Sequence, residues 1–195
     1  MKKYGLMLLL LCLALPVHAQ ETTDERGTRY DVFGAPTAKF SQMNESFALL
    51  GGGRFGWMIG NHYVVGAEGY WLANDVAGPT LSSGESPDIE LRYGGLTFEY
   101  VTNPYDAIHY SVSTLIGVGA MNFNISSAND NDNFYVVEPT ANVYFRMTQY
   151  FKVGLGLGYR YVSDLDVEGL EGSDLSGITA TLSFHFGTYG TTFLP

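Results

Sequence analysis

The chain has 195 residues, and its 20 acidic residues outnumber its 10 basic ones, for a formal net charge of −10. A polyanion without a basic patch is a poor binder of nucleic acid, because that binding depends on lysine and arginine contacts to phosphate. The length suits a single domain. Abundant glycine and tyrosine, with no sustained 3.6-residue apolar periodicity beyond the N-terminus, favour an all-β chain.

The N-terminus has the pattern of a secretory signal peptide. Two lysines precede the apolar run Leu6–Leu15, and small residues stand before a cleavage point after Ala19. The run is shorter than the ~20 residues that a membrane-spanning helix needs. We therefore expect residues 1–19 to be removed on export. Their removal also takes away Cys12, the only cysteine, so disulfides play no part in the mature chain.

Alternating side chains and turn residues predict eight strands. Their ranges are 36–43, 46–60, 63–74, 88–102, 107–123, 133–148, 150–163 and 176–187. Most exceed the ~9–11 residues that a tilted strand needs to cross a bilayer. The sequence predicts an all-β fold, an eight-stranded antiparallel up-and-down transmembrane β-barrel over residues 35–187. A flexible segment over 20–34 would precede the barrel, and a C-terminal tail over 188–195 would follow it.

The connections between these strands alternate in length. Tight turns are predicted at 60–62, 103–105 and 148–149, whereas longer polar segments cover 75–87, 124–132 and 164–175. Short turns at one rim and long loops at the other are typical of outer-membrane barrels. The long segments are acidic and contain no lysine or arginine. We interpret them as a solvated extracellular surface; calcium binding is the alternative, because clustered carboxylates suit that cation.

The two faces of each strand differ in chemistry, most clearly over residues 150–162. Phe151, Leu155 and Tyr159 share an apolar face, and Lys152 and Arg160 share a face with three glycines. A soluble lipocalin-like barrel would show the same alternation reversed. The glycines suit a crowded lumen, aromatics gather near strand ends, and exposed lysines are scarce, so we place the apolar face outward. In the fourth strand the alternation changes phase at residues 94–95, which predicts a β-bulge.

Aromatic residues near the strand ends of the apolar face predict two interfacial girdles. The residues assigned to the girdles are Trp57, Tyr63, Tyr100, Tyr110, Phe145, Phe151 and Phe184 toward the short turns, and Trp71, Tyr93, Tyr135 and Tyr159 toward the long loops.

With its signal peptide, two-faced strands, girdles and loop asymmetry, the chain resembles the small eight-stranded outer-membrane proteins of the OmpX and OmpA transmembrane-domain type. The resemblance is one of architecture and covers about residues 35–187. It implies a monomer in the cell outer membrane, in contact with outer-membrane lipid and with the outer-membrane assembly machinery. Such chains typically end on an aromatic residue; here Phe184 and Phe186 resemble that strand end, but a tail follows them.

Charged residues on the polar face form the strongest candidate site. They are Lys39, Arg54, Glu68, Arg92, Glu99, Glu138, Arg146, Lys152 and Arg160, together with Glu90. An uncompensated buried charge costs several kcal/mol, so charges inside a barrel must be paired. We expect a salt-bridge network that plugs the lumen, since an eight-stranded interior is just wide enough for side chains to fill. The alternative is a narrow channel for small solutes.

His109 and Ser111 resemble the His-x-Ser pair of outer-membrane lipid A deacylases, in which histidine activates a serine nucleophile. Strand parity turns both toward the lumen near the short turns, whereas those enzymes need the pair to face lipid. We therefore expect no enzymatic activity, and a lipid-modifying enzyme is the lesser alternative. No residues have metal-ligand spacing, so we expect neither metal nor cofactor. The predicted role is structural or interactive (envelope integrity, adhesion or protection), with an extracellular partner at the acidic loops.

Overall fold

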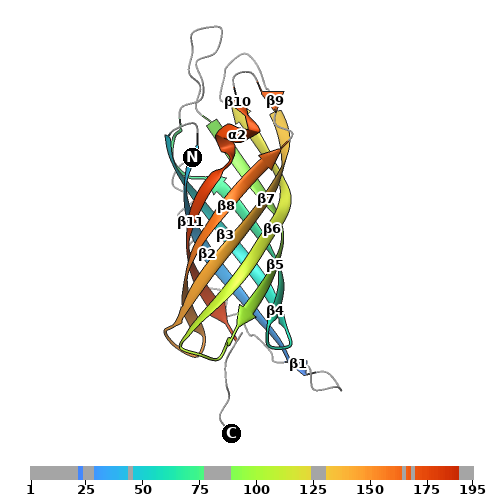
Figure 1. Cartoon of the computed structure of the whole chain (residues 1–195), viewed down its shortest axis with the longest axis vertical. Coiled ribbons are helices and arrows are strands. Elements are labelled where there is room, and N and C mark those ends of the chain that lie inside the picture. The colour runs from blue at the N-terminus through green and yellow to red at the C-terminus, as the bar shows by residue number, and fades with distance from the viewer. Residues whose placement is uncertain are drawn as a thin grey trace, which may run out of the picture.

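Eight long antiparallel strands close into a barrel in the computed structural model (Figure 1). The strands of the barrel are β2 (Arg29–Met43), β3 (Ser46–Ile59), β4 (Tyr63–Leu72), β5 (Ile89–Thr102), β6 (Ile108–Phe123), β7 (Asn131–Arg146), β8 (Phe151–Ser163) and β11 (Gly177–Gly187). The structure describes residues 22–23, 29–43, 46–76, 89–123, 131–163, 166–167 and 170–188. The predicted signal peptide lies outside these residues, as do most of the acidic loops and the tail beyond Thr188.

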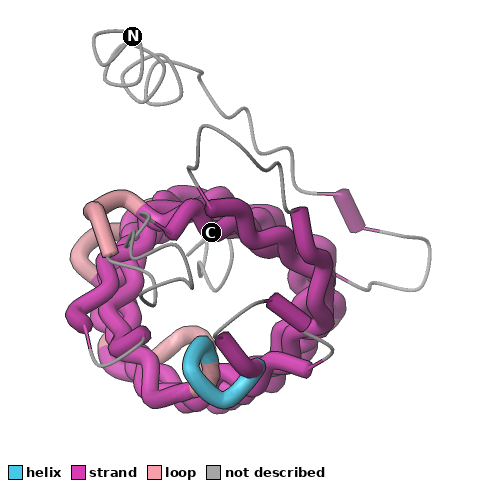
Figure 2. The backbone as a smooth tube through the Cα atoms, turned by 90° about the horizontal axis from the view of Figure 1, so that it is seen from above, coloured by secondary structure: helices cyan, strands magenta, loops and turns pink. Residues whose placement is uncertain are grey.

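Each barrel strand pairs with the next in the sequence, and β11 closes the ring by pairing with β2. Figure 2 shows this closed ring along its axis. The predicted fold class, an eight-stranded up-and-down antiparallel barrel, is therefore confirmed. Short elements flank the ring: β1 (Thr22–Thr23) pairs with β2, and β9 (Asp166–Val167) forms a small hairpin with β10 (Leu170–Glu171).

The two ends of the barrel differ. The connections 60–62, 103–107 and 147–150 form one end, here called the turn rim. The opposite end, here called the loop rim, carries the β9–β10 hairpin and the short helix α2 (Gly172–Leu175). In Figure 2, α2 lies over the inner edge of the ring. Within the described ranges, no helix is both long enough and apolar enough to cross a membrane.

The first barrel strand begins earlier than predicted. Strand β2 starts at Arg29 rather than at residue 36, so residues 29–34 belong to the barrel and not to a flexible lead-in. They pair with β3 over the register Tyr30↔Ile59 to Gly34↔Phe55. Gly34 and Pro36 are weak strand formers, which hid this part of the strand from a reading based on alternation.

The predicted β-bulge in the fourth strand is wrong. Strand β5 keeps an unbroken register with both β4 and β6 through Gly94 and Gly95. Ile89 and Leu91 instead face inward and are buried, while Glu90 is exposed on the outer face. The apolar pattern inverts along β5 because the barrel interior itself becomes apolar at the loop rim.

The interior is packed in three layers. Among the residues that the structure describes, fourteen buried ones form an apolar cluster toward the loop rim, here called the loop-rim cluster, which includes Met43, Leu50, Phe134 and Leu175. A smaller turn-rim cluster consists of Phe33, Ala35, Met58, Val64 and Val101. Buried charged side chains lie between the two. Toward the loop rim the lumen is thus apolar, which is why sequence alternation alone assigns that end of β5 to the wrong face.

Glycine makes room for the large side chains of this interior. Gly119 on β6 is the register partner of Phe134 on β7, and the Phe134 ring occupies the space that a Cβ at Gly119 would need. An aromatic ring lying over a cross-strand glycine is a known device that pins strand register.

We predict that Gly119→Ala destabilises the barrel by about 1–3 kcal/mol, because the added methyl group forces the Phe134 ring out of its site. The matched control is Gly69→Ala, since nothing lies within 4 Å of a Cβ at that position. Urea unfolding of the refolded variants, followed by tryptophan fluorescence, measures both. Equal midpoints for the two variants would contradict this account of the packing.

Candidate functional site

The first part of the charged layer is built around Glu138. Lys39 Nζ on β2 lies 2.8 Å from Glu138 Oε1 on β7, and both side chains are buried. Thr179 on β11 donates a 2.8 Å hydrogen bond to the same oxygen, and the Tyr93 hydroxyl on β5 donates one of 3.0 Å to Oε2. Lys39 Nζ also lies 3.7 Å from the centre of the Tyr70 ring. Side chains from three strands thus converge on a carboxylate carried by a fourth.

The second part is built around Arg54 on β3. Its Nη2 donates a 2.6 Å hydrogen bond to Glu99 Oε2 on β5, and its Nε lies 3.2 Å from Glu68 Oε1 on β4. The hydroxyls of Tyr144 and Ser111 both donate to Glu99 Oε1. Hydrogen bonds to both oxygens and a paired guanidinium are the conditions under which a buried carboxylate can stay ionised.

Tyr70 joins the two parts. Its hydroxyl donates a 2.7 Å hydrogen bond to Glu68 Oε2, while its ring faces the Lys39 ammonium. Thr97 donates a further 2.8 Å bond to Glu68 Oε1. We call Lys39, Arg54, Glu68, Glu99 and Glu138 the ion-pair network. The five charges and the side chains that bond them come from seven of the eight barrel strands.

Arg160 has a separate role. Its side chain is fully buried, with Nε donating a 2.8 Å hydrogen bond to the Leu175 carbonyl and Nη2 donating one of 3.3 Å to Ser41 Oγ. Leu175 ends α2 and packs in the loop-rim cluster. Arg160 therefore ties the short helix to the inside of β8, an attachment that the sequence did not indicate.

The remaining inward cations lie near the turn rim. Arg146 Nη2 donates a 2.8 Å hydrogen bond to the carbonyl of Pro104, which fastens the turn between β5 and β6. Lys152 is buried and lies within the electrostatic reach of Asp31 and Glu99.

His109 and Ser111 face the interior near the turn rim, as strand parity predicts, and both are buried. Ser111 donates to Glu99, and His109 Nδ1 lies 3.4 Å from the Asp106 carbonyl. The pair is therefore turned away from the outer face, where a lipid substrate would have to approach.

Two of the predicted site residues lie on the opposite face. The sequence predicts Arg92 in the lumen and Tyr93 in a girdle, but Arg92 is exposed on the outer face and Tyr93, 3% exposed, is part of the interior. The physical reason is the uninterrupted register of β5. Glu90, which the sequence also predicts in the lumen, lies on the outer face with Arg92.

The other predicted girdle residues lie on the outer face. Trp57, Tyr63, Trp71, Tyr100, Tyr110, Tyr135, Tyr159 and Phe184 are exposed there, and Phe145 and Phe151 are half-buried.

Sequence reasoning missed the interior tyrosines. Tyr70, Tyr93 and Tyr144 each donate a hydrogen bond to a carboxylate of the network. The sequence predicts Tyr93 in a girdle and no role for Tyr70 or Tyr144, although the parity of Tyr144 with Asn142 and Arg146 was available as a signal.

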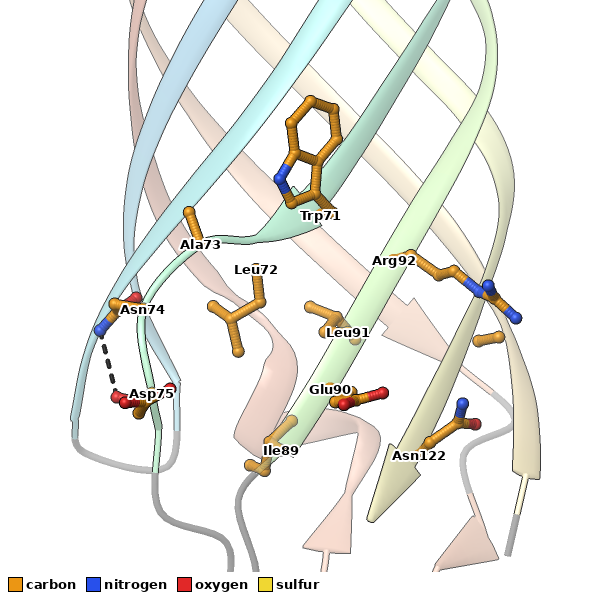
Figure 3. Close-up of a pocket in the computed structure, with 11 residues that line it drawn as sticks. Trp71, Leu72, Ala73, Asn74, Asp75, Ile89, Glu90, Leu91, Arg92 and Asn122 are labelled. Carbon is orange, nitrogen blue, oxygen red and sulfur yellow. Dashed lines mark hydrogen bonds between the residues drawn. The ribbon is translucent and has the colours of Figure 1, made fainter. Parts of the chain in front are cut away.

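The structure contains two hollows of interest. A cavity of about 20 Å³ lies inside the network, between Lys39, Arg54 and Glu68, which is room for about one water molecule. A larger pocket of about 350 Å³ lies at the loop rim between the ends of β4 and β5 (Figure 3). Among the described side chains, no three His, Cys, Asp or Glu residues are grouped closely enough to hold a metal ion.

Comparison with known proteins identifies the fold. The structure is similar to the N-terminal β-barrel domain of Pseudomonas aeruginosa OprF, with a TM-score of 0.56, 18% identity, and coverage of 86% of this chain and 99% of that one. It is also similar to Neisserial surface protein A, with a TM-score of 0.57, 10% identity, and 82% and 96% coverage. A third similar structure is the attachment invasion locus protein Ail of Yersinia pestis, with a TM-score of 0.51, 13% identity, and coverage of 81% of this chain and 96% of that one.

All three are small eight-stranded outer-membrane barrels, so the predicted architectural resemblance is confirmed. No family model and no curated protein matches the sequence. The likeness to these solved structures is one of fold.

We predict that Glu138→Gln lowers the stability of the barrel by about 3–5 kcal/mol, because it leaves the buried Lys39 ammonium without its counter-charge. Glu90→Gln is the control, being the same exchange at an exposed position of the outer face. The temperature at which each variant loses its folded gel mobility measures the effect. The single-channel current of Glu138→Gln in a planar bilayer should not exceed that of the wild type, because the apolar clusters on both sides of the charged layer still fill the barrel. A clear rise in current would contradict a closed interior.

Proposed function

We propose that this chain is a monomeric outer-membrane β-barrel with a structural or surface-interaction role, exercised at its loop rim. The observation that carries this proposal is the exposed apolar outer face. Leu157, Val112 and Ile116 stand at the waist of that face and are each more than half exposed. Such a face on a closed barrel fits hydrocarbon, because only helices and closed barrels satisfy every backbone polar group in a membrane.

The packed interior supports a plugged barrel rather than a channel. The ion-pair network lies between two apolar clusters, and the cavity within it has room for about one water molecule. A conducting pore would need a continuous polar path from rim to rim. We therefore rank the narrow channel below the interactive role, and a lipid-modifying enzyme lowest, since His109 and Ser111 are enclosed.

The acidic segments support a role at the cell surface. Residues 164–175 contain Asp164, Asp166, Glu168, Glu171 and Asp174 and no lysine or arginine. One structural neighbour is described as a surface protein and another as an attachment invasion locus protein. By analogy, and because long loops of outer-membrane barrels face the exterior, we propose that the acidic loops meet an extracellular partner in adhesion, protection or envelope integrity.

The membrane assignment predicts that the purified chain folds only with an amphiphile. In detergent micelles or lipid vesicles it should become protease-resistant and run as a compact band that shifts on boiling, because the outer face requires an apolar environment. In buffer alone it should aggregate. A folded, monodisperse protein in buffer without detergent or lipid would exclude the membrane assignment.

The surface role predicts a loss of binding when the third acidic loop is neutralised. Replacing the carboxylates of residues 164–175 with Asn and Gln should leave the compact gel band unchanged, because the exchange keeps side-chain size and touches no member of the ion-pair network. Adhesion of bacteria displaying each form to immobilised extracellular-matrix proteins is then compared. The role is supported if cells with the wild-type chain adhere and cells with the neutralised form adhere no better than cells that lack the chain. Failure of the wild type to adhere would count against the role.

A further inference from the structure

The wall of the barrel opens between β4 and β5 at the loop rim. The last pair of the two strands is Trp71↔Arg92. Beyond this pair the chain that leaves β4 hydrogen-bonds to β3 instead of β5. Ala73 N donates a 2.7 Å hydrogen bond to the Leu49 carbonyl, Asn74 Oδ1 accepts one from Leu49 N, and Asn74 Nδ2 donates one to the Phe47 carbonyl. Strand β5 continues alone with β6 to Ile89.

The gap closes again farther out, where Ile89 N donates a 2.9 Å hydrogen bond to the Val76 carbonyl. The result is a window bounded by Leu72–Asp75 on one side and Ile89–Arg92 on the other, and the 350 Å³ pocket fills it (Figure 3). The volume falls within the ordinary range of ligand sites.

The pocket is amphipathic. Its apolar floor is the half-buried Leu72, to which Ala73 and Ala120 add further hydrocarbon. Ile89 and Leu91 lie beneath, almost fully buried in the loop-rim cluster against which Leu72 packs. Trp71 and Arg92 line the pocket on the outer face of the barrel. A ligand that fills it therefore touches hydrocarbon side chains at the floor and a cation at the outer edge.

Arg92 is unusual among the basic residues. Lys39, Arg54, Arg146, Lys152 and Arg160 all face inward, so among the basic side chains that the structure describes Arg92 alone is on the outer face. Within the described part of the chain its guanidinium has no hydrogen bond and no ion pair. It lies beside Trp71, 51% exposed, at the level of the loop-rim girdle, where lipid headgroups stand.

We propose that this window is a binding site for a phosphate-bearing lipid of the outer leaflet, with the phosphate on Arg92 and hydrocarbon against the leucine floor. The proposal rests on the membrane assignment above. A guanidinium binds phosphate through two parallel hydrogen bonds, and phosphate is the anion that lipid headgroups supply at this level. A free anion would leave the apolar floor uncovered, which is why we assign a lipid. Glu90 and Asp75 also line the pocket, and their charges oppose a phosphate.

The test measures retention of lipid by the full chain in phosphatidylcholine nanodiscs containing a small fraction of diphosphorylated lipid A. Mass spectrometry of the protein released from the discs counts bound lipid A. We expect Arg92→Gln to weaken retention about tenfold, in line with the loss of a charge-assisted bidentate contact. Arg92→Lys should retain an intermediate amount, because it keeps the charge and loses the fork.

Two further variants separate this site from general surface attraction. Glu90→Gln removes a neighbouring negative charge, so it should retain as much lipid A as the wild type or more. Ala73→Trp fills the pocket and leaves Arg92 in place, so it should reduce retention. Millimolar inorganic phosphate should displace little lipid; complete displacement would mean that a free anion, not a lipid, is the ligand.

The proposal would be overturned if the wild type and Arg92→Gln retained equal amounts of lipid A. It would also be overturned if the wild type retained lipid A equally well with and without the lipid's phosphate groups. All variants are first checked for the compact, heat-shifted band in the same discs. A variant that passes this check and keeps its lipid A contradicts the site alone, whereas a wild type that fails it contradicts the membrane assignment.

Discussion

Closure of the sheet is the constraint on which the other features depend. Pairing of β11 with β2 leaves no free edge on the ring, so every barrel strand has a hydrogen-bonding neighbour on both sides. Water is absent from the hydrocarbon core of a bilayer, and a strand edge exposed there would leave its backbone groups unpaired. Closure also divides the side chains into two sets, since alternate residues must point into the ring or away from it.

The narrowness of the ring explains the chemistry of the interior. Side chains from opposite walls meet in an eight-stranded barrel, as Lys39 of β2 meets Glu138 of β7 and Arg54 of β3 meets Glu99 of β5. Apolar clusters lie on both sides of this layer, and the side chains of its ion pairs are almost fully buried. In such a setting each charge requires a partner and each carboxylate oxygen a donor. The interior tyrosines meet that requirement while filling volume.

The predictable part of this protein follows from periodicity. Eight strands, their order and the facing of β6, β7, β8 and β11 could be read from alternation, because a strand with lipid on one side shows a two-residue period. The inward charges Lys39, Arg54, Glu68, Glu99 and Glu138 could be named for the same reason. Which carboxylate pairs with which cation was not predictable, since the partners come from strands far apart in the sequence and meet only after closure.

By itself the sequence determined that the chain has an apolar and a polar strand face, short and long connections in alternation, and too little positive charge for nucleic acid. Tertiary structure alone decided the two points at which the pattern misleads. The alternation of side chains along a strand shows which residues share a face, but it does not show which face points into the barrel. At the loop rim apolar side chains lie both inside the barrel and on its outer face. Only the register of β5 against its neighbours shows that Tyr93 enters the interior and that Arg92 stands outside beside an open window.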